Sequence, residues 1–275
     1  MSELVAGGFV TSRFLTGLAV SAGVSALVFA VAWLAARRAG RWNVVDVAWG
    51  LSFVLVGAAS FGWSAPAPAS AARRVLVLVL VAVWGLRLAG YIWLRSRGRG
   101  EDPRYAAIMS RARGSQTVHA LRVVFAPQAL LAWFISLPVQ AAMYERNGPG
   151  ALTWAGAAVW AVGLFFEAVG DAQMAAFRRD PANRGQVMDR GLWRYTRHPN
   201  YFGDATVWVG LYLVAASTWE GALTVLSPLA MLYFLYFKSG KGLLEKDLSR
   251  SKPGYADYVR RTSGFLPLPP RRPAG

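Results

Sequence analysis

The sequence predicts an all-α, polytopic membrane protein with about seven transmembrane helices. Of the 275 residues, 55% are hydrophobic and only 16% are charged, whereas an average soluble protein has about 25% charged residues. The basic residues, 30 Lys and Arg against 14 Asp and Glu, lie between long apolar stretches. In a soluble protein such an excess would indicate nucleic-acid binding. Between apolar stretches it indicates contact with membrane lipids, and we expect no nucleic-acid partner.

Seven apolar stretches approach the roughly 20 helical residues needed to cross a hydrocarbon core of about 30 Å. They are residues 14–36, 42–63, 75–94, 123–143, 151–170, 201–219 and 222–237. The first lacks the basic start and the small-residue cleavage site of a signal peptide, so we expect it to remain as a span. No soluble domain fits between the stretches. Residues 1–275 are therefore expected to form a single integral membrane domain.

The distribution of basic residues predicts the orientation. With seven spans, 25 basic residues lie on one side of the membrane and four on the other, while Arg87 lies inside the third span. Cytoplasmic loops are enriched in Lys and Arg. The C-terminus is therefore predicted to be cytoplasmic and the N-terminus to lie outside.

The composition also excludes several kinds of chemistry. Cysteine is absent, which excludes disulfides, thiolate metal sites and cysteine nucleophiles. With only His119 and His198, no metal centre is expected. The sequence has no Walker-type loop and no GxGxxG motif. Any nucleotide must therefore bind at a membrane-embedded, non-Rossmann site.

The second span contains an acidic residue, Asp46, near its predicted cytoplasmic end, with Trp49 and Phe53 following on the same helical face. Polar groups inside a membrane are costly and are often functional. One interpretation is an interfacial carboxylate paired with an arginine such as Arg87. The other is a proton donor or carbonyl-polarising group in an aromatic-lined pocket. The residues leave both open.

The third span has a basic and aromatic stripe that leads toward the cytoplasm. Trp84, Arg87, Tyr91 and Arg95 recur there at helical spacing. Arg95 is expected to extend its guanidinium to the membrane surface. Arg87 lies deeper, so it requires a carboxylate or phosphate partner.

The segment from residue 167 to residue 204 holds most of the remaining candidates. Glu167, Asp171 and Arg178 share one face of a fifth helix that extends past its span. Pro199 suits the first turn of the sixth helix, with His198 near its N-cap.

Several side chains cluster at the start of this sixth helix. Arg194, Arg197 and His198 make its N-terminus favourable for phosphate or another anion. Asn200 and Asp204 are four residues apart, so they face the same way just inside the membrane. A surface that only attracts lipids needs scattered Lys and Arg, and we therefore interpret this segment as a ligand site. Farther on, residues 253–267 predict a short amphipathic helix that returns along the membrane face and ends at a proline. This helix is either an interfacial anchor or a ligand contact.

These residues resemble a known superfamily. Arg197-His-Pro-Asn-Tyr-Phe-Gly-Asp204 is similar to the signature that lines the NADPH pocket of membrane sterol reductases, and Phe177-Arg-Arg-Asp-Pro181 fits the same pattern. Asn43-Val-Val-Asp-Val-Ala-Trp-Gly50 and Gly100-Glu-Asp-Pro-Arg-Tyr105 resemble the bacterial branch called domain of unknown function 1295, which is related to steroid 5α-reductases. The resemblance covers most of residues 40–270, and the reductase-like half lies at about 123–270.

The resemblance implies a bacterial inner-membrane enzyme whose active site opens to the cytoplasm. It implies hydride transfer from NADPH to an activated C=C bond of a lipophilic, steroid-, isoprenoid- or lipid-like substrate. The implied cofactor contacts are Arg87, Asp171, Arg178, Tyr195, Arg197, His198, Asn200 and Asp204.

The resemblance implies less about the substrate side. In steroid 5α-reductases a glutamate and a tyrosine polarise the substrate carbonyl. Asp46 lies near the glutamate's place and Tyr91 is the candidate for the tyrosine. A carboxylic acid kept protonated in an apolar site could supply the hydrogen bond that stabilises a developing enolate. A Tyr-Arg pair that these reductases carry is replaced here by Gly185-Gln186, so the electron donor is better supported than the acceptor.

Two other functions remain open. Isoprenylcysteine and phospholipid methyltransferases share the Arg-His-Pro-x-Tyr-x-Gly run but use S-adenosylmethionine. They usually carry paired glutamates where this chain has Glu245-Lys246, and Asn200 and Asp204 favour the reductase. A transporter or lipid-binding protein would use Asp46 and Arg87 as a relay or gate. The absence of internal repeats counts against a transporter.

Overall fold

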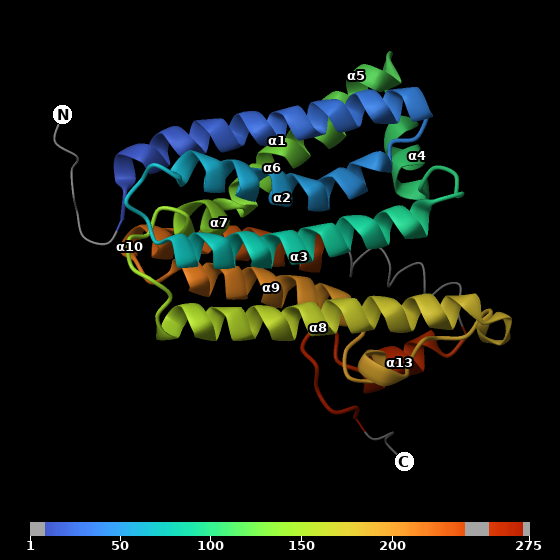
Figure 1. Cartoon of the computed structure of the whole chain (residues 1–275). Coiled ribbons are helices and arrows are strands. Elements are labelled where there is room, and N and C mark those ends of the chain that lie inside the picture. The colour runs from blue at the N-terminus through green and yellow to red at the C-terminus, as the bar shows by residue number, and fades with distance from the viewer. Residues whose placement is uncertain (1–8, 240–252, 272–275) are drawn as a thin grey trace. The chain divides into compact units, whose positions relative to one another are not determined.

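The structure is a computed structural model that describes residues 9–239 and 253–271 (Figure 1). The described part is helical, as predicted, and its β-pairing is confined to two isolated bridges, Phe9 with Glu145 and Thr196 with Ser263. The α-helices are α1 (Thr11–Ala39), α2 (Val44–Ser64), α3 (Ala71–Ser96), α4 (Pro103–Met109), α5 (Gln116–Ala120), α6 (Ala126–Ile135), α7 (Leu137–Ala142), α8 (Ala151–Arg179), α9 (Pro199–Ala215), α10 (Trp219–Ala222), α11 (Leu226–Tyr233) and α13 (Tyr255–Arg261). The π-helical turns are η1 (Leu121–Phe125) and η5 (Phe234–Ser239), and the 3₁₀ turns are η2 (Pro181–Asn183), η3 (Gly191–Arg194) and η4 (Leu223–Val225).

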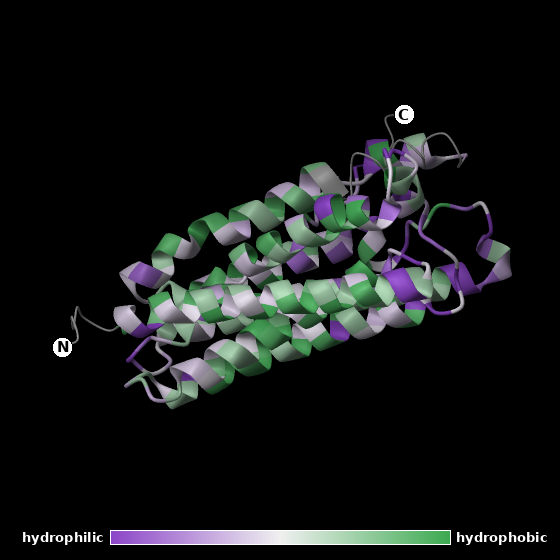
Figure 2. Ribbon diagram, turned by 90° about the horizontal axis from the view of Figure 1, so that it is seen from above, coloured by the Kyte–Doolittle hydropathy of each residue, from purple (hydrophilic) through white to green (hydrophobic). Residues whose placement is uncertain are grey.

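Six helical runs are long and apolar enough to cross a membrane. They are Thr11–Ala39, Val44–Ser64, Ala71–Ser96, Gln116–Ile135, Ala151–Arg179 and Trp219–Phe237. Figure 2 shows hydrophobic residues along the long helices and hydrophilic residues gathered in connecting segments. The predicted span at 201–219 corresponds to α9, whose 17 residues extend only about 25 Å at 1.5 Å per residue. The seventh span and the orientation stay predictions.

The fourth span differs most from its predicted bounds of 123–143. Its helix begins at Gln116, where the Ser115 hydroxyl accepts a hydrogen bond from the N–H of Val118. The polar residues His119 and Arg122 had hidden this start from the hydropathy pattern. The run ends at Ile135, and α7 follows with Pro138 in its first turn. Proline has no N–H to continue the preceding helix.

The chain divides into two compact units. The single membrane domain expected from the sequence stays a prediction. The first unit comprises Met1–Thr153 and Val214–Ser227, and the second comprises Trp154–Leu213 and Pro228–Gly275. In the first unit, α2 and α3 approach closely at Gly50 and Gly85. A Cβ atom at Gly50 would lie 2.7 Å from the backbone oxygen of Gly85, so the two backbones pack in contact, as small residues allow between membrane helices.

A buried ion pair lies near the start of α3 in the first unit. Arg73 and Glu145 are 1% and 0% exposed, and their side chains are 3.0 Å apart. The Arg73 guanidinium also donates to the hydroxyl of Ser217 and to the carbonyls of Asn147, Gly148 and Val214. Burial raises the pKa of the Glu145 carboxyl to about 7, although the charge of Arg73 and the Ser217 hydroxyl oppose the shift. These bonds compensate for the cost of burying two charges.

In the second unit, α8 and α9 pack through glycines. A Cβ atom at Gly163 would lie 2.5 Å from the N atom of Val207, and one at Gly203 would lie 2.4 Å from the N atom of Glu167. The helices therefore touch along their backbones. This contact determines which side chains of the two helices meet at the site.

Candidate functional site

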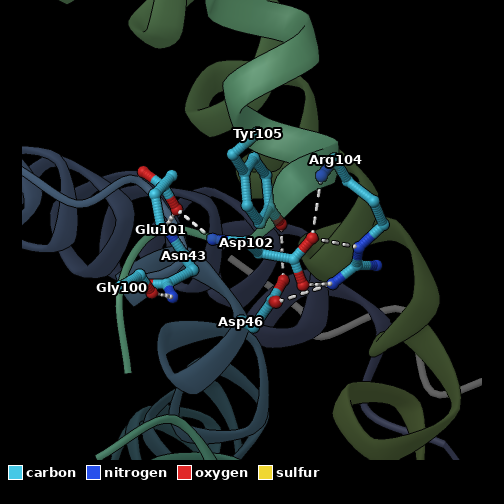
Figure 3. Close-up of polar contacts among 7 residues, drawn as sticks. All are labelled: Asn43, Asp46, Gly100, Glu101, Asp102, Arg104 and Tyr105. Atoms are coloured by element: carbon cyan, nitrogen blue, oxygen red, sulfur yellow. Dashed lines mark hydrogen bonds and ion pairs between the residues drawn. The ribbon is translucent and has the colours of Figure 1, made fainter. Parts of the chain in front are cut away.

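Asp46 in the first turn of α2 is the centre of a polar cluster in the first unit. The Tyr105 hydroxyl donates a 2.5 Å hydrogen bond to Asp46 Oδ1, and Arg104 Nη2 lies 3.2 Å from Asp46 Oδ2. Figure 3 shows Tyr105 and Arg104 extending from α4 toward this carboxylate. Asp46 is thus paired with an arginine, as one interpretation of the sequence proposed, and that arginine is Arg104. The tyrosine that contacts Asp46 is Tyr105.

The segment 100–105 brings these groups together because each of its acidic residues caps a helix. Glu101 accepts hydrogen bonds from the N–H groups of Trp42 and Asn43, which precede α2. A carboxylate at a helix N-terminus is stabilised by the helix dipole. Asp102 accepts from the N–H of Arg104 at 2.9 Å and so caps α4, whose first residue is a proline. These bonds attach the segment to the start of α2 and place the side chains of Arg104 and Tyr105 beside Asp46 (Figure 3).

The surroundings shift the pKa values of Tyr105, Asp102 and Arg104. Burial raises the pKa of the Tyr105 phenol, and the nearby charge of Asp46 raises it further. Burial by itself would also raise the pKa of the Asp102 carboxyl, but hydrogen bonds from Arg104 and its charge outweigh this effect, so the pKa is lowered. The hydrogen bond to Asp102 raises the pKa of the Arg104 guanidinium. At neutral pH the site therefore offers a protonated phenol beside a fixed positive charge.

Aromatic side chains pack together farther along α2 and on α3. Trp49 contacts Phe53 edge-on at a ring-centroid distance of 5.3 Å, and Phe53 contacts Trp84 at 5.4 Å. Phe53 and Trp84 are fully buried. The predicted stripe on α3 is also formed, since the guanidinium groups of Arg87 and Arg95 lie 5.5 and 5.6 Å from the ring centre of Tyr91. These are cation–π distances.

The second unit brings together residues of α8 and α9. Asn200 Nδ2 donates to Asp171 Oδ1 at 3.2 Å. Asp171 and Glu167 on α8 and His198 and Asp204 on α9 or at its start are all buried. Gly170 lies under this contact, because a Cβ atom there would come within 3.3 Å of the N atom of Asn200. The two helices that approach here thus carry four buried ionisable side chains.

The segment before α9 is fastened to α8. Trp193 Nε1 donates to the carbonyl of Gly170 at 3.0 Å, and Gln173 Oε1 accepts from the N–H of Leu192 at 2.9 Å. α9 begins at Pro199, which confirms the predicted position of His198 at its N-cap. His198 stacks on Tyr201 with ring centroids 5.3 Å apart and an interplanar angle of 11°.

The predicted cofactor residues divide into inward and outward groups within this unit. Arg197 is half-buried, and its Nη1 donates to the carbonyls of Val259 and Thr262, so it holds the C-terminal segment in place. Arg178 and Tyr195 are exposed, and Arg178 lies in the last turn of α8. The predicted C-terminal helix is present as α13. It ends at Arg261 rather than at a proline, because Thr262 turns to an extended conformation and the following residues pair with the segment before α9.

A family profile described as Protein of unknown function (DUF1295) matches residues 32–262. The chain belongs to this family. No curated protein and no solved structure matches the chain. The match spans both motifs of the Asp46 cluster and the whole of α8 and α9. In this DUF1295 protein, Asn43 of the first motif donates to the carbonyl of Gly100 of the second at 3.3 Å.

Sequence reasoning missed the roles of Glu101, Arg104 and Tyr105. The signal that could have located them is the motif Gly100–Tyr105, which carries the DUF1295 resemblance but had no assigned role. Asp46 and Tyr105 are 59 residues apart, so no local pattern links them. Glu245, which bore on the methyltransferase alternative, lies outside the described residues.

Proposed function

We propose that the protein is a membrane reductase that takes hydride from NADPH and delivers it to an activated C=C bond of a lipophilic substrate. The observation that carries the proposal is the hydrogen bond between Asn200 and Asp171. It joins two residues, 29 positions apart, that the sterol-reductase resemblance assigns to the same cofactor. The proposed enzyme lies in the inner membrane of a bacterial cell, with its site open to the cytoplasm, as the positive charge of the loops favours.

The residues of the second unit fit a phosphate-bearing dinucleotide. The Asp171 carboxylate and the Asn200 amide offer acceptors and donors for hydroxyl and carboxamide groups. Arg178 lies in the last turn of α8 and Arg194 lies shortly before α9, and both are exposed. Guanidinium groups bind phosphates well. NADPH would supply the hydride chemistry, while the protein binds and orients it.

The acceptor side of the proposal rests on the Asp46 cluster. Hydride addition to a conjugated C=C bond places negative charge on the oxygen of the acceptor, which a hydrogen-bond donor stabilises. The raised pKa of Tyr105 keeps its hydroxyl protonated at neutral pH. In the proposed reaction this hydroxyl turns its hydrogen from Asp46 to the substrate oxygen, while the pair of Asp46 and Arg104 stays beside the phenol. In this proposal Tyr105, rather than Tyr91, is the tyrosine that polarises the substrate carbonyl.

The first test is ligand binding to the full-length protein in detergent, measured by thermal shift with NADPH, NADH and S-adenosylmethionine in parallel. A ligand at 100 times its Kd stabilises a protein by about 2.7 kcal/mol. We expect stabilisation by NADPH and its loss in the variant Arg178→Ala, Asn200→Ala. Arg179→Ala is the matched control, because Arg179 is the exposed neighbour of Arg178 in the same helical turn.

A positive result leads to assays of NADPH oxidation with enones and unsaturated lipids. Stabilisation by S-adenosylmethionine alone would replace the reductase with a lipid methyltransferase. The absence of any stabilisation, or an unchanged NADPH affinity in the double variant, would favour the transporter or lipid-binding function instead.

A further inference from the structure

A pocket of about 280 Å³ lies beside the end of α13 in the second unit. It is formed by the last turn of this helix, by the extended residues that follow it and by Arg197. Four of its lining residues are arginines: Arg197, Arg260, Arg261 and Arg271. None of the described residues that line it is acidic. Arginines clustered in this way bind phosphate or a similar oxyanion.

Two of these arginines have carboxylate partners beside the pocket. Arg260 pairs with Asp257, and Arg261 pairs with Asp189 at 2.5 Å. Both pairs are solvent-exposed, and exposed ion pairs contribute little to stability. Their guanidinium groups can therefore turn to a stronger, doubly charged partner at little cost.

The backbone around the pocket is held by hydrogen bonds. The N–H of Arg197 donates to the carbonyl of Ser263 at 2.9 Å, and the N–H of Leu268 donates to the carbonyl of Tyr195 at 3.0 Å. The N–H of Arg271 donates to the carbonyl of Arg261 at 2.8 Å, which closes the segment back on α13. The arginines thus extend from a preformed frame, which lowers the entropic cost of binding.

Two exposed leucines lie on the segment that follows α13. Leu268 lines the pocket and is 52% exposed, and Leu266 nearby is 57% exposed. Exposed leucines beside a basic surface are typical of segments that lie at a membrane surface. Pocket volumes for drug-sized ligands begin at about 300 Å³, so this pocket suits a headgroup rather than a whole dinucleotide.

We propose that this pocket binds the phosphate headgroup of an anionic phospholipid, with Arg261 and Arg271 holding the phosphate and Leu266 and Leu268 entering the lipid surface. The pocket shares Arg197 with the cofactor contacts that the resemblance implies, but Asp171, Arg178 and Asn200 do not line it. Basic clusters next to a membrane bind anionic lipids in this way. A lipid bound here fixes the C-terminal segment against the membrane.

The test measures binding of soluble short-chain lipids to the full-length protein in neutral detergent. The probes are dihexanoyl phosphatidic acid, inorganic phosphate and dihexanoyl phosphatidylcholine. We expect saturable binding of phosphatidic acid that weakens at least tenfold in Arg261→Gln, Arg271→Gln. The control Arg111→Gln, Arg113→Gln removes the same charge from exposed positions elsewhere and should change nothing. The variant Leu266→Asn, Leu268→Asn should weaken phosphatidic acid binding at least threefold without affecting phosphate.

Thermal unfolding of each variant checks folding, and Arg271→Gln alone serves as a milder second variant. Equal losses in the two arginine double variants would overturn the site in favour of general attraction to a basic protein. Phosphate that binds as tightly as phosphatidic acid would overturn the lipid assignment and identify a soluble phosphate as the ligand. NADPH stabilisation, measured in the same arginine variants, should be unchanged, so failure here is distinguishable from failure of the reductase proposal.

Discussion

Tyr105 donates its hydroxyl hydrogen to a carboxylate that already has an arginine partner. Arg104 supports the charge of Asp46, and burial keeps the Tyr105 phenol protonated by raising its pKa. The phenol is therefore an O–H donor that stays protonated beside the N–H donors of Arg104. Asp46 contributes by orienting it.

This arrangement predicts different effects for two tyrosines. In the proposed reaction, Tyr105→Phe should lower the turnover of NADPH oxidation by about 10²–10⁴, the usual contribution of a positioned proton donor. Tyr91→Phe should have a small effect, because Tyr91 lies with Arg87 and Arg95. NADPH affinity, measured by thermal shift, should be unchanged in both. A larger loss in Tyr91→Phe would return the donor role to that residue.

Glu145 predicts a pH dependence of stability. Its pKa is raised from 4.5 to about 7 in the folded protein, so its stabilising contribution is full below pH 4.5 and is lost as the pH rises through 7. We expect the Tm of the native protein to fall relative to that of Glu145→Gln between pH 5 and pH 8, by about 2–4 °C for each kcal/mol. Thermal scans of both proteins at each pH measure this difference. A constant difference across the range would contradict the raised pKa.

The residues of the site were unequally predictable. Asp171, Asn200 and Asp204 could be selected because they are polar residues at helical spacing inside apolar stretches. Tyr105 could not, since it follows a charged loop and becomes important only through a contact 59 residues away. Arg197 was predicted as a cofactor contact, and that role stays a prediction; its bonds to Val259 and Thr262 had no sequence signal.

Among the helices, the contact of α8 with α9 has the largest effect on the site. Gly163 and Gly203 let the two backbones touch, and this places Asn200 beside Asp171. The Gly in the signature Arg197–Asp204 thus has a packing role separate from any ligand contact. Its replacement should separate the helices.

We therefore expect Gly203→Ala to destabilise the protein by about 1–3 kcal/mol, the usual cost of overpacking, and to weaken NADPH binding. Gly62→Ala is the control, because a Cβ atom there meets nothing within 4 Å. Alanine in a helix is favoured over glycine by about 1 kcal/mol, so the control should be neutral or stabilising. Thermal unfolding of the two variants tests this, and equal Tm values would contradict the packing role.

Helix positions followed from hydropathy more closely than helix ends did. The spans predicted at 14–36 and 75–94 lie inside α1 and α3, and the span predicted at 42–63 begins two residues before α2, because long apolar runs leave little ambiguity. The ends depend on caps such as Ser115 and on prolines such as Pro138. The short helix α4 carries Tyr105, but with seven residues it is too brief for a periodic signal.

For the whole molecule, the charge asymmetry predicts which segments face the cytoplasm. The chain has no cysteine, so a single introduced cysteine shows on which side of the membrane its own position lies. A membrane-impermeant maleimide should label Ala65→Cys, an exposed residue between α2 and α3, in intact cells. It should label Ser110→Cys, an exposed residue after α4, only after permeabilisation. The unmodified protein is the unlabelled control. The reverse labelling pattern would contradict the predicted orientation and show that the C-terminus lies outside.

The hydrogen bond from Thr196 to the carbonyl of Phe265 spans 69 residues, which has a consequence for biosynthesis. At about 5–20 residues per second, the ribosome needs roughly 3–14 s to make the intervening chain. During that time α8 and α9 have already been made, while the Tyr195–Arg197 segment still awaits its partners. The residues before α9 therefore acquire their final bonds late, and a nascent chain arrested before residue 265 would lack the bond from Thr196 to Phe265.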